Sequence, residues 1–363
     1  MLLEQIKDKT FFEKTISELK KKNIAADVQL LEKTVVALFL VESLVEQGLE
    51  FIFKGGTSLI LLLSEIKRFS IDVDIITEEN DTKVKNIINC IIESQTLFTR
   101  FEENIRKNST TQRMNIQHYK FFFNSFIDDS EKYILLDIAY ETNKYSKIIE
   151  KKIENKMLNI KSNLLVKVPS IESILGDKLT VLATNTTGIS FDSNKELEII
   201  KQIYDVDKLF NEAQDISVIK NSFINISESE INYRKLKEIT YKDVLEDIQN
   251  LSENIIFMKN KDNIEKINIG MKKFANYRLE KKFLIDKEIL TAAAKIFYLI
   301  QLIKNNEQLI DKYNKSYIEP KNIEIPIEYR KRLKIIKKIN IEAYFYIINS
   351  IKIKNKNKSL REN

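Results

Sequence analysis

Turn-forming residues are scarce in this chain, and this scarcity limits its fold more than any other feature. The 363 residues include only six glycines and three prolines. An all-β sandwich or barrel needs many tight turns, most of which use glycine or proline, whereas long helices need few. The chain is also long enough for about two domains, each with a core of its own. The composition therefore predicts a helix-rich protein and excludes an all-β fold.

The spacing of apolar residues divides the chain into a mixed first part and a helical second part. Strand-like runs are expected at 49–53, 69–77, 114–126 and 132–140. Residues 80–107 have helical spacing, and the pattern after Pro169 is helical, with a basic tail at 352–363 that is expected to fray. We therefore predict an α+β protein with an α/β domain over residues 1–168 and a helical domain over 169–363.

Single copies of cysteine and histidine limit the metal chemistry that is open to the chain. Cys90 and His118 exclude a disulfide framework, a cysteine zinc cluster and a histidine-rich site. A metal ion would be held mainly by oxygen, which favours Mg²⁺ or Mn²⁺. No stretch of about 18 uncharged apolar residues occurs, and the N-terminal residues carry charges where a signal peptide is apolar. We expect a cytoplasmic protein with no membrane association.

Two of the six glycines are adjacent, between a predicted strand and a predicted helix. They lie in the run Phe53-Lys54-Gly55-Gly56-Thr57-Ser58-Leu59. A turn of this kind leaves backbone N–H groups at a helix N-terminus with no Cβ to keep an anion away. It is not a Walker A loop, because no Gly-Lys-Ser/Thr follows at the right spacing. A Gly-Gly pair alone is usually only a turn, but in this setting it indicates a phosphate cradle.

Two aspartates follow in the next predicted strand, in the run Ser70-Ile71-Asp72-Val73-Asp74-Ile75. Because residues i and i+2 of a strand point the same way, Asp72 and Asp74 present two carboxylates on one face. Carboxylates this close repel each other unless a cation lies between them. Alone, the pattern usually marks a solvated strand. After a strand, a Gly-Gly turn and a helix, it indicates a metal-dependent phosphate site.

Together these motifs resemble the AbiEii/AbiGii toxin family, within the DNA polymerase β-like nucleotidyltransferases. The matching runs are Lys54-Gly55-Gly56-Thr57-Ser58-Leu59, Arg68-Phe69-Ser70-Ile71-Asp72-Val73-Asp74, Gly176-Asp177-Lys178-Leu179 and Lys201-Gln202-Ile203-Tyr204-Asp205-Val206. Gln202 departs from the family, which often has an acid there. The resemblance implies a polymerase-β-like domain with a mixed sheet, followed by a helical domain that contributes Lys178 and Asp205 to the cleft.

The resemblance also implies a role for each motif. Asp72 and Asp74 would bind Mg²⁺ or Mn²⁺, and Asp137 on a neighbouring strand is a further candidate ligand. Lys178 would meet phosphate charge, and Asp205 would place the acceptor hydroxyl, orient Lys178 or act as a base. The residues implied in nucleotide binding are Lys54, Gly55, Gly56, Thr57, Ser58 and Ser70.

Several of these residues have a structural interpretation as well. Asp137 would equally suit an edge strand. Composition alone would place Lys178 on the solvent-facing side of a helix, but its motif favours a functional role. Ser70 and Lys54 would then be ordinary residues at the ends of strands. Asp207, two positions after Asp205, is a weaker candidate for the same role.

A second motif suggests a different chemistry. Arg113 and His118 have the Arg-x4-His spacing of HEPN ribonucleases, some of which are toxins. In those enzymes the pair lies at a helix turn, whereas the residues here alternate like a strand, and Met114 replaces the usual polar residue. A HEPN-type ribonuclease is therefore one alternative, and a nucleotide-binding module that has lost catalysis is another.

The implied reaction transfers a nucleotide from a nucleoside triphosphate to RNA, with a tRNA 3′ end as the acceptor. The implied setting is a bacterial type IV toxin–antitoxin or abortive-infection system, whose antitoxin is encoded nearby and does not stay bound. The net charge of +6 permits a polyanionic partner. The basic run at 330–338 would grip an RNA backbone or form a solvated helix face.

Overall fold

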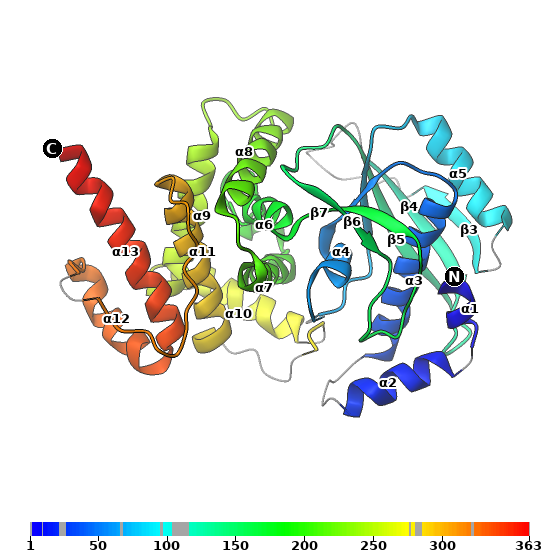
Figure 1. The fold of residues 1–363 in the computed structure, drawn as a ribbon, viewed down its shortest axis with the longest axis horizontal. Coiled ribbons are helices and arrows are strands. Elements are labelled where there is room, and N and C mark those ends of the chain that lie inside the picture. Colours follow the sequence, from blue (N-terminus) through cyan, green and yellow to red (C-terminus); the bar gives the residue numbers. More distant parts are fainter. Residues whose placement is uncertain are drawn as a thin grey trace. The chain divides into compact units, whose positions relative to one another are not determined.

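The chain folds into two compact units. The computed structural model (Figure 1) describes residues 2–8, 10–21, 27–65, 68–94, 97–103, 116–275, 277–279, 285–320 and 323–362. The first unit, called the α/β unit, comprises Met1–Lys144, Ile148–Ser170 and Asn276–Lys281. The second, called the helical unit, comprises Tyr145–Lys147, Ile171–Ala275 and Lys282–Asn363.

Among the described residues, a seven-stranded mixed sheet forms the centre of the α/β unit (Figure 1). Its strands are β1 Ile52–Lys54, β2 Val73–Thr77, β3 Phe98–Glu103, β4 Ile116–Asn124, β5 Glu131–Tyr140, β6 Ile148–Lys152 and β7 Leu165–Pro169. Their order across the sheet is β3-β4-β5-β2-β1-β7-β6. β2 runs parallel to β5 and β1 parallel to β7, while the other neighbours are antiparallel. The predicted α+β class with a mixed sheet is confirmed.

Helix α3, Val28–Glu46, packs against β2 and β5. Asp27 caps its start, because the Asp27 carboxylate accepts hydrogen bonds from the backbone N–H groups of Gln29 and Leu30 at 2.8 and 3.1 Å. The strands bury every second side chain, among them Val73, Ile75, Leu136, Ile138, Tyr119 and Phe121. Strand alternation therefore directs one set of side chains into the core and leaves the other set, which includes the predicted site residues, on the opposite face.

The remaining helices of the α/β unit are α1 Leu2–Ile6, α2 Phe11–Lys21, α4 Gly55–Leu62 and α5 Asp81–Ser94. The helix predicted over 80–107 is confirmed over Asp81–Ser94 and is wrong over Phe98–Glu103, which forms the edge strand β3, while 95–96 and 104–107 lie outside the described residues. Phe98 and Phe101 pair with Phe123 and Phe121 of β4 across a register shift, and no glycine or proline separates them from the helix before them. Strands β6 and β7 were not predicted either.

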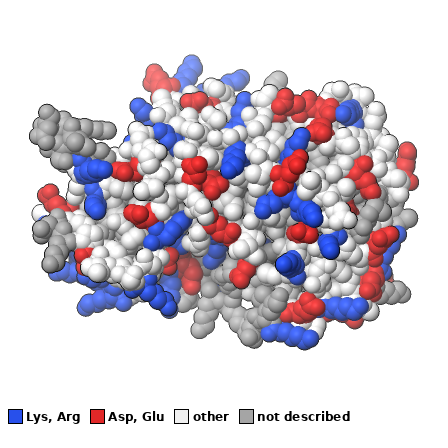
Figure 2. All heavy atoms as spheres, viewed as in Figure 1, with Lys and Arg blue, Asp and Glu red and all other residues white. Residues whose placement is uncertain are grey.

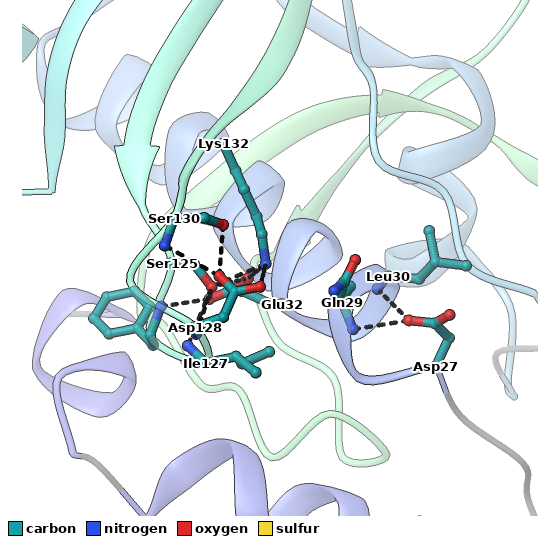
Figure 3. A network of polar contacts seen from close by, with 10 residues as sticks. Asp27, Gln29, Leu30, Glu32, Ser125, Ile127, Asp128, Ser130 and Lys132 are labelled. Atoms are coloured by element: carbon teal, nitrogen blue, oxygen red, sulfur yellow. Dashed lines mark hydrogen bonds and ion pairs between the residues drawn. The ribbon is translucent and has the colours of Figure 1, made fainter.

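A buried carboxylate joins α3 to the turn between β4 and β5 (Figure 3). Glu32 is fully buried, and its oxygens accept hydrogen bonds from the Ser125 hydroxyl at 3.0 Å and from the Phe126 backbone N–H at 2.6 Å. The Lys132 ammonium lies 3.2 Å from Glu32 and 3.2 Å from Asp128. Because the charge of Glu32 is paired and hydrogen-bonded, its burial is tolerated, and the hairpin is fixed against the helix.

The helical unit is built from helices that pack against one another. They are α6 Ile171–Thr180, α7 Glu196–Glu212, α8 Ile216–Tyr233, α9 Tyr241–Phe257, α10 Lys261–Phe274, α11 Leu290–Lys304, α12 Ile327–Ile339 and α13 Ile341–Glu362, with a 3₁₀ turn at Phe191–Ser193 and a π turn at Ile285–Ile289. The most extensive contacts between these helices join α6 to α8 and α11 to α13. The fraying predicted for 352–363 is not seen over 352–362, where the backbone continues α13. No helix within the described residues is both long and apolar enough to cross a membrane.

Candidate active site

The Gly-Gly turn brings the start of α4 directly against the predicted carboxylates. β1 ends at Lys54, and α4 begins at Gly55, whose φ of +75° is a left-handed value that favours glycine. A Cβ on Gly55 would lie 2.1 Å from Asp74 Oδ2. A Cβ on Gly56 would lie 2.7 Å from Ser70 Oγ and 2.8 Å from Arg68 Nη2. Both glycines are therefore needed for this approach, which gathers four predicted site residues around one helix N-terminus.

The two hydroxyl residues that follow the glycines are buried and bonded to the backbone. Thr57 donates to the carbonyl oxygen of Asp72 at 2.5 Å, and Ser58 donates to the carbonyl oxygen of Gly55 at 2.9 Å. Neither side chain is exposed. Both hydroxyls thus tie the helix start to the turn and to the segment that carries the aspartates. In this arrangement, Ser58 supports the cradle rather than lining it.

A row of polar residues crosses four neighbouring strands on the face away from α3. Lys54 of β1 is the register partner of Asp74 of β2, and Asp74 is the register partner of Asp137 of β5. Asp137 is in turn the partner of His118 of β4, and His118 Nδ1 lies 2.7 Å from Asp137 Oδ1. Asp72, which is exposed, precedes β2 by one residue and shares the face of Asp74.

This row explains why Asp137 is next to the aspartate pair, although 63 residues separate it from Asp74 in the chain. The short-range pattern could identify Asp72 and Asp74, but only the parallel pairing of β2 with β5 brings Asp137 beside them. The contact between His118 and Asp137 was not predicted. Its only sequence signal is that each residue alternates with buried neighbours in a strand.

The residues of this face fit a hard divalent cation. Within the described residues, no three His, Cys, Asp or Glu side chains are gathered in a way that would hold a metal ion by themselves. Mg²⁺ commonly binds through one or two carboxylates and completes its shell with water and substrate phosphates. Asp72 and Asp74 supply such a donor set, and the N–H groups at the start of α4 lie beside it to receive an anion.

Lys178 and Asp205 meet in the core of the helical unit. Lys178 Nζ lies 2.8 Å from Asp205 Oδ2 and donates to Gln202 Oε1 at 3.0 Å. Lys178 is 5% exposed and Asp205 is 2% exposed. The interpretation of Lys178 as a solvent-facing lysine is therefore wrong. Gln202 and Asp205 share a helix face because they are three residues apart, and this spacing was the available signal that Gln202 also contacts Lys178.

The other residues of the lysine motif position α6. A Cβ on Gly176 would lie 2.6 Å from the carbonyl oxygen of Ile219, so glycine permits the close crossing of α6 and α8. Asp177 accepts a hydrogen bond from the Tyr145 hydroxyl at 2.6 Å, and Leu179 is fully buried. The motif thus fixes the helix from which Lys178 extends.

Asp207 belongs to a different contact of the same unit. Its Oδ1 lies 2.7 Å from Lys295 Nζ, which also donates to Asn211 Oδ1 at 2.8 Å and lies 3.1 Å from Glu342 Oε1. Burial acts to lower the pKa of Lys295, but Asp207 and Glu342 outweigh it and raise that pKa. This cluster joins α7, α11 and α13, which supports a structural role for Asp207.

The pair predicted for a ribonuclease is described only in part. Arg113 lies outside the described residues. His118 lies in β4, as the alternation predicts, and not at a helix turn. Its contact with Asp137 places it at the edge of the carboxylate row.

The basic run at 330–338 forms most of α12, and basic side chains gather over that helix at the lower left of Figure 2. Elsewhere on the face in view, the two signs of charge are interspersed. Lys331 and Lys334 are exposed, whereas Arg332 is half-buried and donates through Nε to the carbonyl oxygen of Ile256 at 3.0 Å. Lys331 and Lys334 are therefore available to a partner, and Arg332 also supports packing.

A pocket of about 430 Å³ in the α/β unit does not coincide with the predicted site. It lies at the other end of β1 and β2, near Ile52 and Thr77. Its acids are Glu50, Glu78, Glu79 and Glu141, with Lys167 as the single cation among its lining residues. This excess of negative charge is unsuited to a triphosphate.

Comparison with known proteins gives one sequence match and several structural ones. A family model described as "Nucleotidyl transferase AbiEii toxin, Type IV TA system" matches residues 38–276. None of the curated proteins matches the chain in sequence. Among solved structures, JHP933 from Helicobacter pylori is 15% identical with a TM-score of 0.43, and the match covers 78% of this chain and 94% of that one. An antigenic nucleotidyltransferase-like protein from Paracoccidioides brasiliensis is 15% identical with a TM-score of 0.37, covering 65% and 92%.

Proposed function

The chain belongs to the AbiEii nucleotidyl transferase toxin family, and from this premise we propose that it transfers a nucleotide from a nucleoside triphosphate to RNA, with a tRNA 3′ end as the acceptor. The observation that carries the proposal is the approach of Gly55 to Asp74. This approach sets an anion-binding helix start beside a pair of cation-binding acids, which is the combination that a metal-bound triphosphate requires.

In this proposal Asp72 and Asp74 hold Mg²⁺ or Mn²⁺, and Asp137, which contacts His118 on the next strand, borders the pair without being a required ligand. When bound, the ion would stabilise negative charge on the attacking and leaving oxygens. The N–H groups at Gly55 and Gly56 bind phosphate oxygens. Lys54 adds a positive charge from the register position next to Asp74, which supports its place among the nucleotide-binding residues.

Lys178 is proposed to neutralise charge that develops on the phosphates. Asp205 and Gln202 hold its ammonium at 2.8 and 3.0 Å, which favours an orienting role for Asp205 over a role as a base. This mechanism requires that the helical domain, residues 169–363 in the proposed division, brings Lys178 to the cradle formed by residues 1–168.

The proposed setting is the cytoplasm of a cell that encodes a separate antitoxin nearby, and the antitoxin does not stay bound. RNA is proposed as the acceptor because the chain carries a net charge of +6 and the exposed Lys331 and Lys334 on one helix. Charge reversal of these two lysines is expected to weaken RNA binding in a salt-dependent manner and to leave triphosphate binding unchanged.

The proposal is tested by incubating the protein with each labelled nucleoside triphosphate, Mg²⁺ and total RNA. We expect label on RNA of tRNA size with the wild-type chain and none with Asp72→Asn or Asp74→Asn. Both variants should keep the wild-type circular dichroism, because Asp72 is exposed and Asp74 is only half-buried.

Label on protein with RNA unmodified would refute the RNA acceptor and leave nucleotide transfer standing. Full activity of folded Asp74→Asn would refute the carboxylate site itself. Triphosphate binding without transfer to any acceptor would favour the nucleotide-binding module that has lost catalysis.

A further inference from the structure

The helical unit contains a second polar pocket, which no residue of the candidate active site lines. It has a volume of about 650 Å³ and is bordered by residues of α8, α9, α11 and α13. Four of its lining residues are lysines, namely Lys220, Lys242, Lys304 and Lys354. Glu246 is the single acid among the residues that line it. The lining therefore has a formal charge of 4 − 1 = +3.

The positive charges of this pocket are only partly compensated from within. Lys304 forms an ion pair with Glu246 and donates to Gln249 Oε1 at 2.7 Å, so the one acid is already neutralised. Lys220 donates a hydrogen bond to the Asn306 side chain, which is uncharged. Lys242 and Lys354 are exposed and form no ion pair with any residue that the structure describes. Clustered lysines of this kind attract an anion.

Two of the residues that line the pocket, Gln249 and Gln301, are buried amides that a hydrogen-bond chain ending at Glu253 holds in place. Gln301 Nε2 donates to Gln249 Oε1 at 2.9 Å, and Gln249 Nε2 donates to Glu253 Oε1 at 2.9 Å. These three side chains are buried, so their positions are held by mutual hydrogen bonds. Buried amides next to exposed lysines suit an anion that also carries hydrogen-bonding groups.

The size and aromatic lining of the pocket narrow the class of ligand. A volume of this magnitude lies in the range of small-molecule and cofactor sites. Tyr241, at the first position of α9, is half-buried and lines the pocket, where its ring can stack with a base. Phosphates would contact the lysines, and a base would contact Tyr241 and the amides.

We propose that this pocket binds a phosphate-bearing nucleotide, presented as part of an RNA strand or free in solution. Binding of an RNA strand rests on the proposed function, since the pocket would then hold a part of the acceptor RNA that lies away from its reacting 3′ end. Binding of a free nucleotide does not depend on the proposed function. In both cases the same lysines meet the phosphates.

The test measures binding by the full chain in which Lys242→Gln and Lys354→Gln are combined. A matched control combines Lys261→Gln and Lys272→Gln, which are exposed lysines of α10 and change the net charge equally. One arm uses a fluorescent single-stranded oligoribonucleotide, and the other uses a fluorescent nucleoside triphosphate. Both are run in EDTA, so that a metal-dependent site does not contribute.

We expect the pocket variant to bind about tenfold more weakly in at least one arm, and the control to stay within about twofold of the wild type. For RNA, removal of two phosphate contacts should also reduce the salt slope of log K by about 1.4, at roughly 0.7 per contact on a single strand. A loss confined to the oligoribonucleotide assigns the pocket to an RNA strand, and a loss confined to the triphosphate assigns it to a free nucleotide.

Equal binding by the pocket variant and the control in both arms would overturn the proposal. Nucleotide transfer to RNA is measured separately in Mg²⁺. Absence of transfer by the wild-type chain would refute the proposed function and would not alter the outcome of the binding assay, so the two failures are distinguishable.

Discussion

Helix α7 carries two buried aspartates, and each pairs with a buried lysine of a different helix. Asp205 lies 2.8 Å from Lys178 of α6, and Asp207 lies 2.7 Å from Lys295 of α11. Two positions along a helix correspond to a rotation of about 200°, so the two aspartates face different neighbours. By distance and burial the pairs are equivalent, and neither measure identifies the one that takes part in catalysis.

The acceptors around each lysine do distinguish the pairs. A lysine ammonium has three N–H donors. Lys295 has three acceptors, namely Asp207, Asn211 and Glu342, whereas Lys178 has two among the described residues, namely Asp205 and Gln202. The Lys295 ammonium is therefore fully occupied within the protein. Within the described part of the chain, the Lys178 ammonium has no third acceptor, so one of its donors can meet a phosphate oxygen, which supports its proposed role.

The largest expected effect comes from replacing both members of each pair with apolar residues. Lys178→Met with Asp205→Leu should lower transfer by about a hundredfold or more, because the cation that meets the phosphate is lost. Lys295→Met with Asp207→Leu should retain transfer. Both variants should fold, since apolar replacement of a complete buried ion pair is often neutral for stability. Single-turnover labelling of RNA at equal concentrations of folded protein measures the difference.

Equal loss of transfer in both double variants would contradict the inferred difference between the two ion pairs. It would show that α7 is needed as an intact helix and that neither pair has a specific chemical role. The free energy of unfolding in urea, measured for the same samples, separates this outcome from loss of folded protein.

A smaller effect is expected when only one member of the Lys295–Asp207 pair, called the structural pair, is replaced, and this effect is on stability. Among the residues that the structure describes, Asp207→Ala leaves the buried Lys295 ammonium with one carboxylate, that of Glu342, whose side chain is 38% exposed. The free energy of unfolding should fall by about 3–5 kcal/mol. Glu342→Gln is the matched control and should cost about 1 kcal/mol or less. A fall of less than about 1 kcal/mol for Asp207→Ala would mean that the cluster is not the structural centre inferred here.

The sequence predicted the parts of the site that depend on local geometry. The Gly55-Gly56 turn and the spacing of Asp72 and Asp74 follow from one strand, one turn and one helix start, and each has a pattern that is visible over a few residues. The helical second part followed in the same way from apolar spacing, whereas the mixed sheet was implied by the family resemblance of the motifs.

The parts that depend on long-range pairing were not predictable. Asp137 lies beside Asp74 only because β5 pairs with β2, and no sequence pattern specifies that register. The burial of Lys178 depends on the crossing of α6, α7 and α8, which a lysine on a helix does not reveal. The edge strand β3 was missed because it has six residues, four of them polar, and no breaker before it.

The His118–Asp137 pair of the α/β unit is more exposed than the two lysine–aspartate pairs of α7. His118 and Asp137 have side chains that are 17% and 23% exposed, and 2.7 Å separates their polar atoms. His118→Ala should lower transfer by less than about tenfold, because one partly solvated hydrogen bond contributes about 1 kcal/mol. Labelling of RNA measures this, with Lys178→Ala as the reference. Loss of toxicity on induced expression in His118→Ala, with toxicity retained in Lys178→Ala, would favour the ribonuclease.

The smallest expected effect concerns Lys312, a second cation beside the structural pair. Burial and, to a smaller extent, the charge of Lys295 lower the pKa of Lys312 to about 8, while Glu172 acts in the opposite direction. The ordinary value of 10.5 applies to the unfolded chain, so between pH 8 and 10.5 the unfolded state binds more protons than the folded state. Stability must therefore rise with pH across this window, since the cost of a buried charge is present below pH 8 and is relieved above it.

Lys312→Met removes this titration and keeps the contact of the side chain with the Phe210 ring, over which Lys312 Nζ lies at 3.7 Å. The variant should be more stable than the wild type near pH 7, and its advantage should shrink as the pH rises towards about 10. Urea unfolding of both proteins across this range measures the difference, in which the titration of all other groups cancels. An advantage of Lys312→Met that does not change with pH would mean that Lys312 is neutral or solvated, and that the structural pair has no competing charge.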